Sequence, residues 1–322
     1  MTPRRILVTG GTGFIGSHLV RRLASEGHEL HALHRPDSGA HRRLDPATAA
    51  RLWPCDLADA ERATTVLAAI RPEVIYHLAG DTGVRVLDPA LASVTRSVES
   101  NVRASINLIV SAQAHCPDLQ ILIRLGGLEE YGRGPVPYVE GQREQPVSPY
   151  SASQVATTHY LQMLAPYLRY RVLTVRPALI YGPGQSTQFF IPALIDHCLK
   201  GKDFTISSGS PGRDLLYIDD IVEALATLRE HSLPSGDILN FGAGREYLMA
   251  DVAAAIVRLA AAKIRLLPGA PMRPTEIEHF HCSTHKAETL LGWRPAVRLE
   301  DGLRRTIAWF REQHDGARLS SP

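Results

Sequence analysis

Short apolar runs alternate with longer amphipathic segments along the first half of the chain. The runs have the length of buried strands and lie at residues 6–9, 30–33, 51–54, 74–79, 121–125 and 172–175. The segments between them place apolar residues at helical spacing, over residues 14–26, 59–70, 91–114 and 150–168. Strands separated by helices are typical of a parallel, doubly wound sheet. We therefore predict an α/β Rossmann fold, which binds ligands at the carboxyl ends of its strands.

The pattern becomes irregular after Tyr181-Gly182-Pro183-Gly184. Apolar periodicity there predicts a strand at 203–206, a return to the sheet at 238–240, and helices over 192–200, 219–229, 249–262 and 300–312. This change in pattern indicates a second, smaller unit. We predict a dinucleotide-binding domain of residues 1–178, to which 214–242 returns, and a C-terminal substrate-binding lobe formed by 179–213 and 243–322.

Composition excludes several classes of partner. The 322 residues include 35 Lys and Arg against 33 Asp and Glu, so the net charge of +2 gives no electrostatic case for binding nucleic acid or an anionic membrane. The four Cys are scattered without a CxxC pair, which favours a reducing compartment. No apolar run reaches the length of a membrane span, and the start lacks a signal-peptide pattern. We expect a cytoplasmic protein.

The strongest chemical signal is the glycine-rich segment that follows the first strand. Glycine permits a tight turn at Gly10, close approach of a pyrophosphate at Gly13, and close packing of the next helix at Gly16. The N-terminus of that helix offers N–H groups to the phosphates. We predict a dinucleotide site, to which this segment contributes Gly10, Thr12, Gly13, Phe14, Ile15 and Gly16.

The residues after the second strand bear on the choice of cofactor. An acidic residue there would bind the ribose 2′-hydroxyl of NAD, whereas an Arg accommodates the 2′-phosphate of NADP. The sequence has His34-Arg35 at this place, followed by Asp37 and Arg42. We favour NADP as the cofactor, and NAD stays open because Asp37 could reach the ribose.

The spacing Gly10-x-x-Gly13-x-x-Gly16 resembles that of extended short-chain dehydrogenases/reductases, the nucleotide-sugar epimerase/dehydratase family. The resemblance continues along nearly the whole chain, through Tyr131-Gly132, Tyr150, Arg176-Pro177, Tyr181-Gly182-Pro183 and Arg213-Asp214. It implies a homodimer formed through the helices near 91–114 and 150–168. Further predicted cofactor contacts are made by His34, Arg35, Asp56, Leu57, Leu78, Ala79, Gly80, Asn101, Tyr150 and Gln154.

The resemblance implies a nucleoside diphosphate-sugar as substrate. Arg213, and Arg273 in Arg273-Pro274-Thr275-Glu276, match Arg residues that contact the diphosphate, and Glu276 matches a Glu that meets a sugar or ribose hydroxyl. Phe190 is a candidate for the base pocket, and Asp81 for the sugar site. Leu179 stands where the family often has an Asn that binds the sugar diphosphate, so the sugar pose is expected to differ.

The catalytic positions depart from the family pattern. Its members use a Ser or Thr, a Tyr as general acid/base, and a Lys that lowers the Tyr pKa and bonds the nicotinamide ribose. Tyr150 matches the Tyr, but Gln154 stands at the Lys position and Gly127 at the Ser or Thr position. Dehydratases follow the latter with Asp-Glu, whereas this chain has Leu128-Glu129. Dehydration is therefore disfavoured, and Glu129 is a candidate base.

Three interpretations stay open at this point. Tyr150 acts alone as a proton donor, the acid/base role has moved to Glu129, Glu130 or Asp81, or the protein binds its ligands without turnover. The histidine-rich run at 278–285 lacks a second cluster or an HExxH motif, so we expect no metal. Our favoured prediction is an NADPH-dependent reductase of a nucleotide-diphospho-4-keto-sugar. The alternatives are an epimerase or dehydratase with retained cofactor, and a noncatalytic dinucleotide sensor.

Overall fold

The computed structural model describes residues 3–36, 43–44, 48, 50–84, 88, 90–208, 211–271 and 276–319. The chain forms two compact units. The first comprises Met1–Gly134, Glu140–Pro177 and Val222–Asn240, and the second comprises Pro135–Val139, Ala178–Ile221 and Phe241–Pro322. These compact units have other bounds than the predicted domains. Residues 135–139 belong to the second unit, the main part of the first unit ends at 177 rather than 178, and the return runs over 222–240 rather than 214–242.

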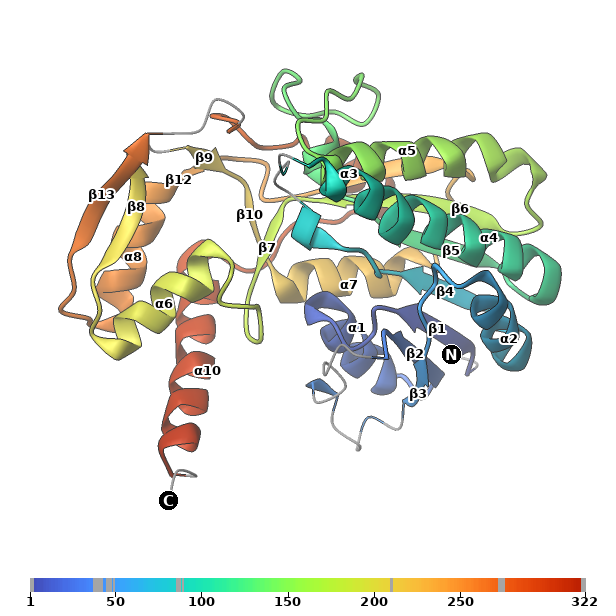
Figure 1. Cartoon of the computed structure of the whole chain (residues 1–322), viewed down its shortest axis with the longest axis horizontal. Helices are drawn as coiled ribbons and strands as arrows, with labels where there is room; N and C mark the ends of the chain where they lie inside the picture. The colour runs from blue at the N-terminus through green and yellow to red at the C-terminus, as the bar shows by residue number, and fades with distance from the viewer. Residues whose placement is uncertain are drawn as a thin grey trace. The chain divides into compact units, whose positions relative to one another are not determined.

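The first unit is built on a seven-stranded sheet with the strand order β11-β6-β5-β4-β1-β2-β3 (Figure 1). The pairs from β6 to β3 are parallel, and the order reverses beside β1, as expected of a doubly wound sheet. The predicted α/β Rossmann fold is confirmed. The strands are β1 (Arg5–Thr9), β2 (Glu29–His34), β3 (Arg51–Pro54), β4 (Val74–His77), β5 (Ile121–Leu125), β6 (Arg171–Pro177) and β11 (Asp237–Phe241).

Helices cover both faces of this sheet. On one face lie α2 (Ala60–Ile70), α4 (Ala104–His115) and α5 (Pro149–Leu164), which bury apolar side chains against β1, β4 and β5 (Figure 1). On the other lie α1 (Phe14–Ala24) and α7 (Ile218–Leu228), joined by an ion pair of 2.7 Å between Arg22 and Glu223. Polar caps set where these helices begin: Asp59 accepts the N–H of Arg62 before α2, and Ser148 accepts that of Ser151 before α5.

The predicted helix over 91–114 is continuous but not uniform. It begins with α3 (Ala92–Ser97), passes through a π-helical turn at Val98–Arg103, and continues as α4. Such turns inside α-helices frequently occur at functional sites. Short 3₁₀ turns stand at Thr82–Val84 after β4, at Leu128–Glu130 after β5, and at Ala165–Tyr167 after α5.

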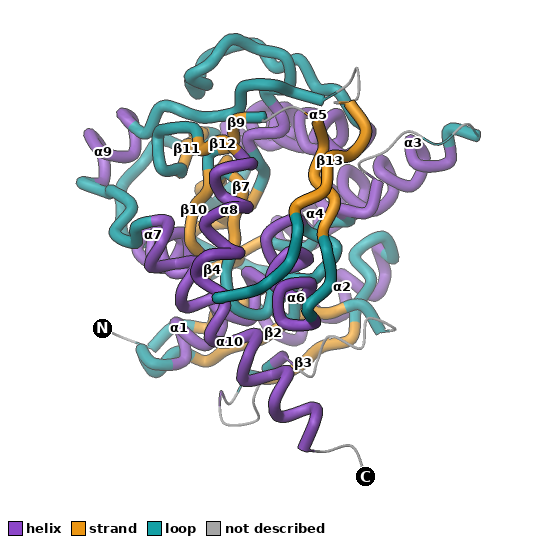
Figure 2. The backbone as a smooth tube through the Cα atoms, turned by 90° about the vertical axis from the view of Figure 1, so that its left-hand side faces the viewer, coloured by secondary structure: helices purple, strands orange, loops and turns teal. Residues whose placement is uncertain are grey.

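The second unit pairs short strands with helices. Its two-stranded sheets are β7 (Leu179–Tyr181) with β10 (Leu215–Tyr217), β9 (Gly212–Arg213) with β12 (Tyr247–Leu248), and β8 (Phe204–Ser208) with β13 (Leu266–Pro271). The helices α6 (Phe190–Lys200), α8 (Met249–Ala260) and α10 (Leu299–Leu319) lie side by side, and α9 spans His285–Leu291 (Figures 1 and 2). Across the described ranges, no helix has the length and apolar character needed to cross a membrane.

Candidate active site

The glycine turn between β1 and α1 has the geometry that the sequence predicts. Gly10 adopts a φ of +66°, and a methyl group added to it would lie 2.9 Å from the backbone nitrogen of Ala79. A methyl group on Gly16 would lie 2.2 Å from the carbonyl oxygen of Gly10, so Gly16 lets α1 close onto the turn itself. Side chains at either position would fill this cradle.

The start of α1 offers hydrogen-bond donors to an anion. Gly13 occupies the N-cap position, where no side chain caps the helix, and the first turn carries no acidic residue. The N–H groups of a first helical turn, which Phe14 and Ile15 begin here, have no partner within the helix. Thr12 is buried beside them. The turn therefore fits the pyrophosphate of a dinucleotide, which such helix ends bind.

The residues predicted to contact the adenosine half follow β2 and β3. His34 is half-buried at the end of β2, and the Arg35 side chain is exposed directly after it. Asp56 is exposed and accepts the N–H of Ala58 at 2.9 Å, whereas Leu57 is buried. Asp37 and Arg42 lie outside the described residues. The carboxyl ends of β2 and β3 thus carry an exposed guanidinium with no carboxylate at position 35.

Asn101, in the π-helical turn, ties the end of β4 to α5. Its side-chain oxygen accepts the N–H of Asp81 at 2.7 Å, and its side-chain nitrogen donates to Ser153 Oγ at 2.9 Å. Ser153 in turn donates to the carbonyl oxygen of Tyr150 at 2.7 Å. The segment after β4, which carries the predicted cofactor residues Leu78, Ala79 and Gly80, is therefore tied to α5.

Tyr150 and Gln154 are both buried on α5, one helical turn apart. Arg124, from β5, donates through Nη2 to the side-chain oxygen of Gln154, and also to its carbonyl oxygen at 3.1 Å. Arg124 Nη1 donates to Thr158 Oγ1 at 2.7 Å. A buried guanidinium therefore contacts the neutral residue that replaces the expected Lys.

Glu130 is enclosed by donors from four segments. Its carboxylate accepts from Arg176 Nε at 2.9 Å and Nη2 at 2.6 Å, from Thr158 Oγ1 at 2.7 Å, and from the N–H of Gly127 at 3.2 Å. Arg124 Nη1 lies 3.6 Å away. Glu130 is fully buried in this arrangement. It is an internal counterion of the two arginines, and these contacts speak against the interpretation that Glu130 took over the acid/base role.

Asp81 is similarly occupied. Its carboxylate forms an ion pair of 2.6 Å with Arg96 and accepts the N–H of Gly83 at 2.9 Å. The side chain is buried, whereas that of Arg96 is 60 % exposed. Asp81 thus holds the segment after β4 in place, and this pairing speaks against a free base at this position.

Glu129 covers the position where the Ser or Thr hydroxyl is missing. A methyl group added to Gly127 would lie 2.5 Å from Glu129 Oε2. Gly127 has a φ of −175°, an extended conformation open to any residue, so backbone geometry does not require glycine here. Of the carboxylates considered for the acid/base role, the half-buried Glu129 is the one that lies over this position.

His77 ends β4 and stands opposite Arg124 of β5. Its Nδ1 is 2.7 Å from Thr9 Oγ1, and its Nε2 is 2.8 Å from Ser105 Oγ. Burial, together with the nearby charge of Arg124, lowers the pKa of His77 to about 3. The imidazole is therefore neutral at physiological pH and joins β1, β4 and α4 by hydrogen bonds.

The second unit brings together two of the predicted substrate residues. Arg213 Nη2 lies 3.4 Å from Glu276 Oε1, and its guanidinium faces the ring of Phe280 at 6.0 Å. Arg273 lies outside the described residues. Phe190 packs edge to face on Phe204, with ring centroids 5.7 Å apart, which is a contact within the unit rather than evidence for a base pocket.

Leu179 and Asp214 connect β7 and β10 in the second unit. The N–H of Leu179 donates to the carbonyl oxygen of Asp214 at 3.1 Å. The buried carboxylate of Asp214 accepts the N–H groups of Ala243 at 2.6 Å and Gly244 at 3.1 Å, and burial raises its pKa to about 6. The Asp of the Arg213-Asp214 motif is therefore structural, and it positions Arg213 next to it.

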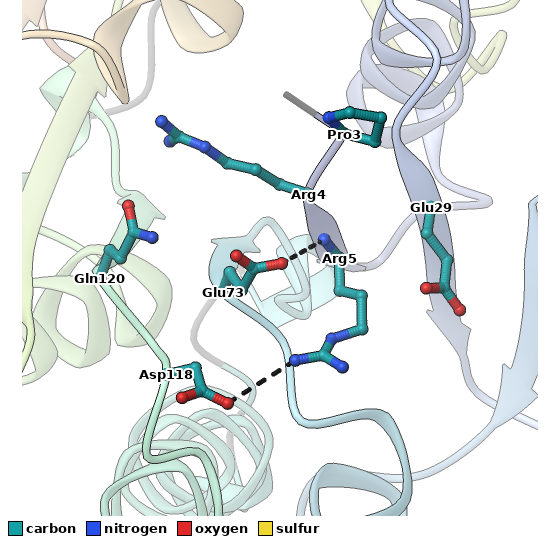
Figure 3. Close-up of a pocket in the computed structure, with 7 residues that line it drawn as sticks. All are labelled: Pro3, Arg4, Arg5, Glu29, Glu73, Asp118 and Gln120. Atoms are coloured by element: carbon teal, nitrogen blue, oxygen red, sulfur yellow. Dashed lines mark hydrogen bonds and ion pairs between the residues drawn. The ribbon is translucent and has the colours of Figure 1, made fainter. Parts of the chain in front are cut away.

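A hollow of about 540 Å³ lies at the amino ends of the strands. The residues that line it, drawn in Figure 3, are Pro3, Arg4, Arg5, Glu29, Glu73, Asp118 and Gln120. Arg5 forms an ion pair of 3.7 Å with Asp118, and its N–H donates to Glu73 at 2.9 Å. Doubly wound sheets bind ligands at the opposite edge. We therefore do not assign this hollow to the active site.

The histidine-rich run does not gather metal ligands. His279 Nδ1 and His281 Nδ1 lie 3.0 and 3.1 Å from the carboxylate of Glu246. Within the part of the chain that the structure describes, no group of three or more His, Cys, Asp or Glu is placed to hold a metal ion.

The strand order, the glycine turn and the Tyr150 helix together define a dinucleotide-dependent enzyme class. The model of the NAD-dependent epimerase/dehydratase family matches residues 6–242, and the chain belongs to this family. The resemblance seen in the motifs is thereby confirmed.

Individual relatives cover almost the whole chain. A UDP-glucose 4-epimerase of Mycolicibacterium smegmatis is 30% identical over 96% of this chain and 99% of its own length. A human dTDP-D-glucose 4,6-dehydratase is 27% identical over 96% of this chain and 90% of its own length. Epimerases and dehydratases are thus both among the relatives.

Two solved structures have the same fold over the same extent. A UDP-glucose 4-epimerase of Thermotoga maritima with UDP-glucose has a TM-score of 0.88 and 26% identity, over 96% of this chain and 99% of that one. A UDP-glucose 4-epimerase of Thermus thermophilus with NAD has a TM-score of 0.85 and 29% identity, over 95% of this chain and 99% of that one. These neighbours bind the predicted classes of substrate and cofactor.

The sequence interpretation overlooked Arg124. The signal that could have found it is a single charge in the apolar run Ile121-Leu122-Ile123-Arg124-Leu125. Arg is almost never fully buried in a protein unless it is paired. A charged residue inside a predicted core strand therefore indicates an internal partner, and here the partners are on α5 and the loop after β5.

Proposed function

We propose that this protein is an NAD(P)-dependent nucleoside diphosphate-sugar epimerase that acts at C4 of the hexose. The observation that carries the proposal is Tyr150, buried at the family's acid/base position on α5, the helix that Asn101 ties to the segment after β4. Leu128 replaces the dehydratase Asp, so one of the two groups needed to eliminate water is absent. The UDP-glucose 4-epimerases among the relatives support the same reaction.

The residues of the chain would divide the work as follows. The cradle of Gly10, Gly13 and Gly16 would hold the pyrophosphate of the cofactor, which supplies the hydride acceptor when bound. The ionised phenol of Tyr150 would take the proton of the C4 hydroxyl as C4 is oxidised to the ketone, and would return it as the ketone is reduced on its opposite face. No net oxidation results.

Arg213 is the residue that would bind the diphosphate. Arg213 and Glu276 form an ion pair with each other in the structure. A diphosphate would replace Glu276 as the partner of Arg213, because charge-assisted bonds to phosphate suit a guanidinium. Glu276 would then be released to accept a sugar or ribose hydroxyl.

A second candidate is NADPH-dependent reduction of a nucleotide-diphospho-4-keto-sugar. The observation that favours it is the exposed Arg35 after β2, where a carboxylate would repel the 2′-phosphate of NADP. Tyr150 would then serve only as a proton donor to the ketone oxygen, a role that a neutral phenol can fill.

Thermal unfolding with and without ligands tests the proposal. We expect NADP or NAD to raise Tm, and UDP-glucose to raise it further in the wild type but much less in Arg213→Gln. A reductase would consume NADPH with a keto-sugar, whereas an epimerase would interconvert sugars without net consumption. If no nucleoside diphosphate-sugar alters Tm in the presence of either cofactor, the substrate assignment is wrong. Binding of cofactor and sugar without turnover would indicate a noncatalytic dinucleotide sensor.

We also propose that the protein is a homodimer through α4 and α5. Valine, tyrosine and methionine side chains on these helices are exposed although they are large and apolar: Val110, Tyr160 and Met163. Exposed apolar surface of this kind marks interaction sites. Sedimentation equilibrium of the full chain should give twice the mass of 35.3 kDa, and a monomer at all concentrations would refute the proposal.

A further inference from the structure

We propose that Arg124 is a positioning residue of the active site, which supplies the positive charge next to Tyr150 and fixes the amide of Gln154 toward the cofactor side. Arg124 and Gln154 would together replace the single Lys that the family pattern leads one to expect at position 154. The inference rests on the proposed function, because it assigns Arg124 to the site around Tyr150.

The environment of Arg124 shows that it is held on all sides. It follows the apolar part of β5, where it stands opposite His77 on β4 and Thr174 on β6. The side chain is only 2 % exposed. Its guanidinium bonds the side chain and carbonyl of Gln154 and the hydroxyl of Thr158, and lies 3.6 Å from Glu130. A buried charge needs partners of this kind, and those of Arg124 on α5 fix the position of its guanidinium.

The donors of Arg124 decide which way the amide of Gln154 points. A guanidinium has only N–H donors, so it must face the amide oxygen and not the amide nitrogen. The amide nitrogen then points to the end of β4, where a methyl group on Gly80 would lie 3.8 Å from Gln154 Nε2 and 3.5 Å from Asn101 Oδ1. Gln154 thereby presents a donor to the place where the predicted cofactor residues gather.

Electrostatics link Arg124 to the phenol. Burial lowers the pKa of Arg124, while the negative charges that Glu130 and Tyr150 can carry raise it. Because such an interaction acts on both groups, the guanidinium and the phenol are electrostatically coupled. The other charged or titratable neighbours of Arg124 are Arg176, which binds Glu130, and His77, which is neutral.

The arrangement changes the expected effect of restoring a Lys. In Gln154→Lys, the ammonium would face the Arg124 guanidinium inside the protein, where two like charges repel strongly. Moving the charge in Arg124→Met/Gln154→Lys avoids this repulsion. Gln154→Lys should therefore have a lower free energy of unfolding than Arg124→Met/Gln154→Lys. If residue 154 did not interact with Arg124, this order would not be expected.

The direct test is a titration of Tyr150 by ¹³C NMR in the full chain labelled at the tyrosine ring. The Tyr150 resonance is identified by its absence from Tyr150→Phe. Arg124→Met should move the midpoint upward by about one pH unit or more, whereas Arg124→Lys should stay within about half a unit of the wild type. Thr158→Val is the matched control, since it removes a partner of Arg124 but leaves the charge, and should also stay within that range.

Cofactor affinity, measured by fluorescence quenching, tests whether Arg124 orients the side-chain amide of Gln154 for cofactor binding. Arg124→Met should weaken NADP or NAD binding by about threefold to tenfold, the effect of one weakened hydrogen bond. Arg124→Met/Gln154→Lys should restore both the midpoint and the affinity. An unchanged Tyr150 midpoint in folded Arg124→Met would overturn the proposal.

If Arg124→Met does not fold, the Tyr150 midpoints of Arg124→Met/Gln154→Lys and Arg124→Lys test the proposal instead. A folded Arg124→Met/Gln154→Lys that titrates at least about one unit above the wild type would also overturn the inference. Neither readout requires a sugar. If no nucleoside diphosphate-sugar binds and the midpoint still moves, the substrate assignment fails while the role of Arg124 stands.

Discussion

Gly126 and Gly127 are adjacent after β5, but their missing side chains have different meanings. A methyl group on Gly126 would lie 2.1 Å from Glu130 Oε1, and that carboxylate is fixed by Arg176. A methyl group on Gly127 would instead meet the end of Glu129, a half-buried side chain that can turn away. Gly126 is thus required by packing, while Gly127 is compatible with other residues.

We predict that Gly126→Ala lowers the free energy of unfolding by about 2–3 kcal/mol, because the buried ion pair must shift. Gly127→Ala, the matched control, should change it by less than about 0.5 kcal/mol. Urea denaturation followed by circular dichroism measures both. Equal losses in the two variants would show that the Glu130 carboxylate does not fix position 126.

His77 makes the stability of the protein depend on pH. Its pKa falls from 6.5 to about 3 on folding. Between these two pH values the imidazole is protonated in the unfolded chain and neutral in the native protein. The stabilisation is complete above pH 6.5 and is lost as the pH falls toward 3. From pH 6.5 to 4.5, the wild type should lose about 2–3 kcal/mol more than His77→Asn, whose amide can still bond Thr9 and Ser105.

Urea denaturation of the two proteins at several pH values provides the comparison. The free energy of unfolding of the wild type minus that of His77→Asn should fall steadily on acidification. Parallel pH profiles would mean that His77 titrates normally in the folded state.

At the scale of elements, Asn101 connects three of them. Its buried amide joins the segment after β4, the π-helical turn and α5. Asn101→Ala should cost about 2 kcal/mol, because the N–H of Asp81 and the hydroxyl of Ser153 lose a buried partner. Hydrogen exchange at the Asp81 amide should accelerate in parallel.

Glu99→Ala is the control in the same turn. Glu99 forms an exposed pair of 3.0 Å with Arg103, so its removal should change stability by less than about 0.5 kcal/mol. If Asn101→Ala is equally mild, the π-helical turn is held by its backbone and not by this side chain.

The elements of the first unit could be predicted because their patterns are local. The strands β1, β4 and β5 are apolar runs, and α2 begins at the Asp59 cap. The strand β13 was missed because Pro268, Gly269 and Pro271 interrupt its apolar pattern, and its pairing with β8 depends on residues some sixty positions away.

In the candidate active site, too, the residues in local motifs could be predicted and the contacts between distant segments could not. Gly10 and Tyr150 are recognised from short motifs. The contacts of Arg124 with Gln154 and Glu130 join β5 to α5 and the next loop, and only the fold brings those segments together. The sequence therefore shows that the Lys is missing, but not what stands beside its replacement.

At the scale of the whole molecule, the residues at the end of β2 bear on the choice between NADP and NAD. Arg35 is exposed after β2, with no acid at the expected place. We predict that the wild type binds NADP more tightly than NAD, and that Arg35→Asp reverses the ratio by about tenfold or more, as one charge-assisted contact to phosphate is lost. Titration calorimetry with both cofactors gives the ratio of the two dissociation constants. If Arg35→Asp leaves this ratio unchanged, Arg35 does not contact the cofactor.

The most direct measurement of the proposed function is proton NMR of UDP-glucose incubated with the protein and NAD or NADP. We predict that signals of the C4 epimer grow until the two sugars reach equilibrium, with no net change in the cofactor. Tyr150→Phe should slow this conversion by about a hundredfold or more, the usual share of a general acid/base. Conversion by Tyr150→Phe at the wild-type rate, or a 4-keto-6-deoxy product in place of the epimer, would contradict the account.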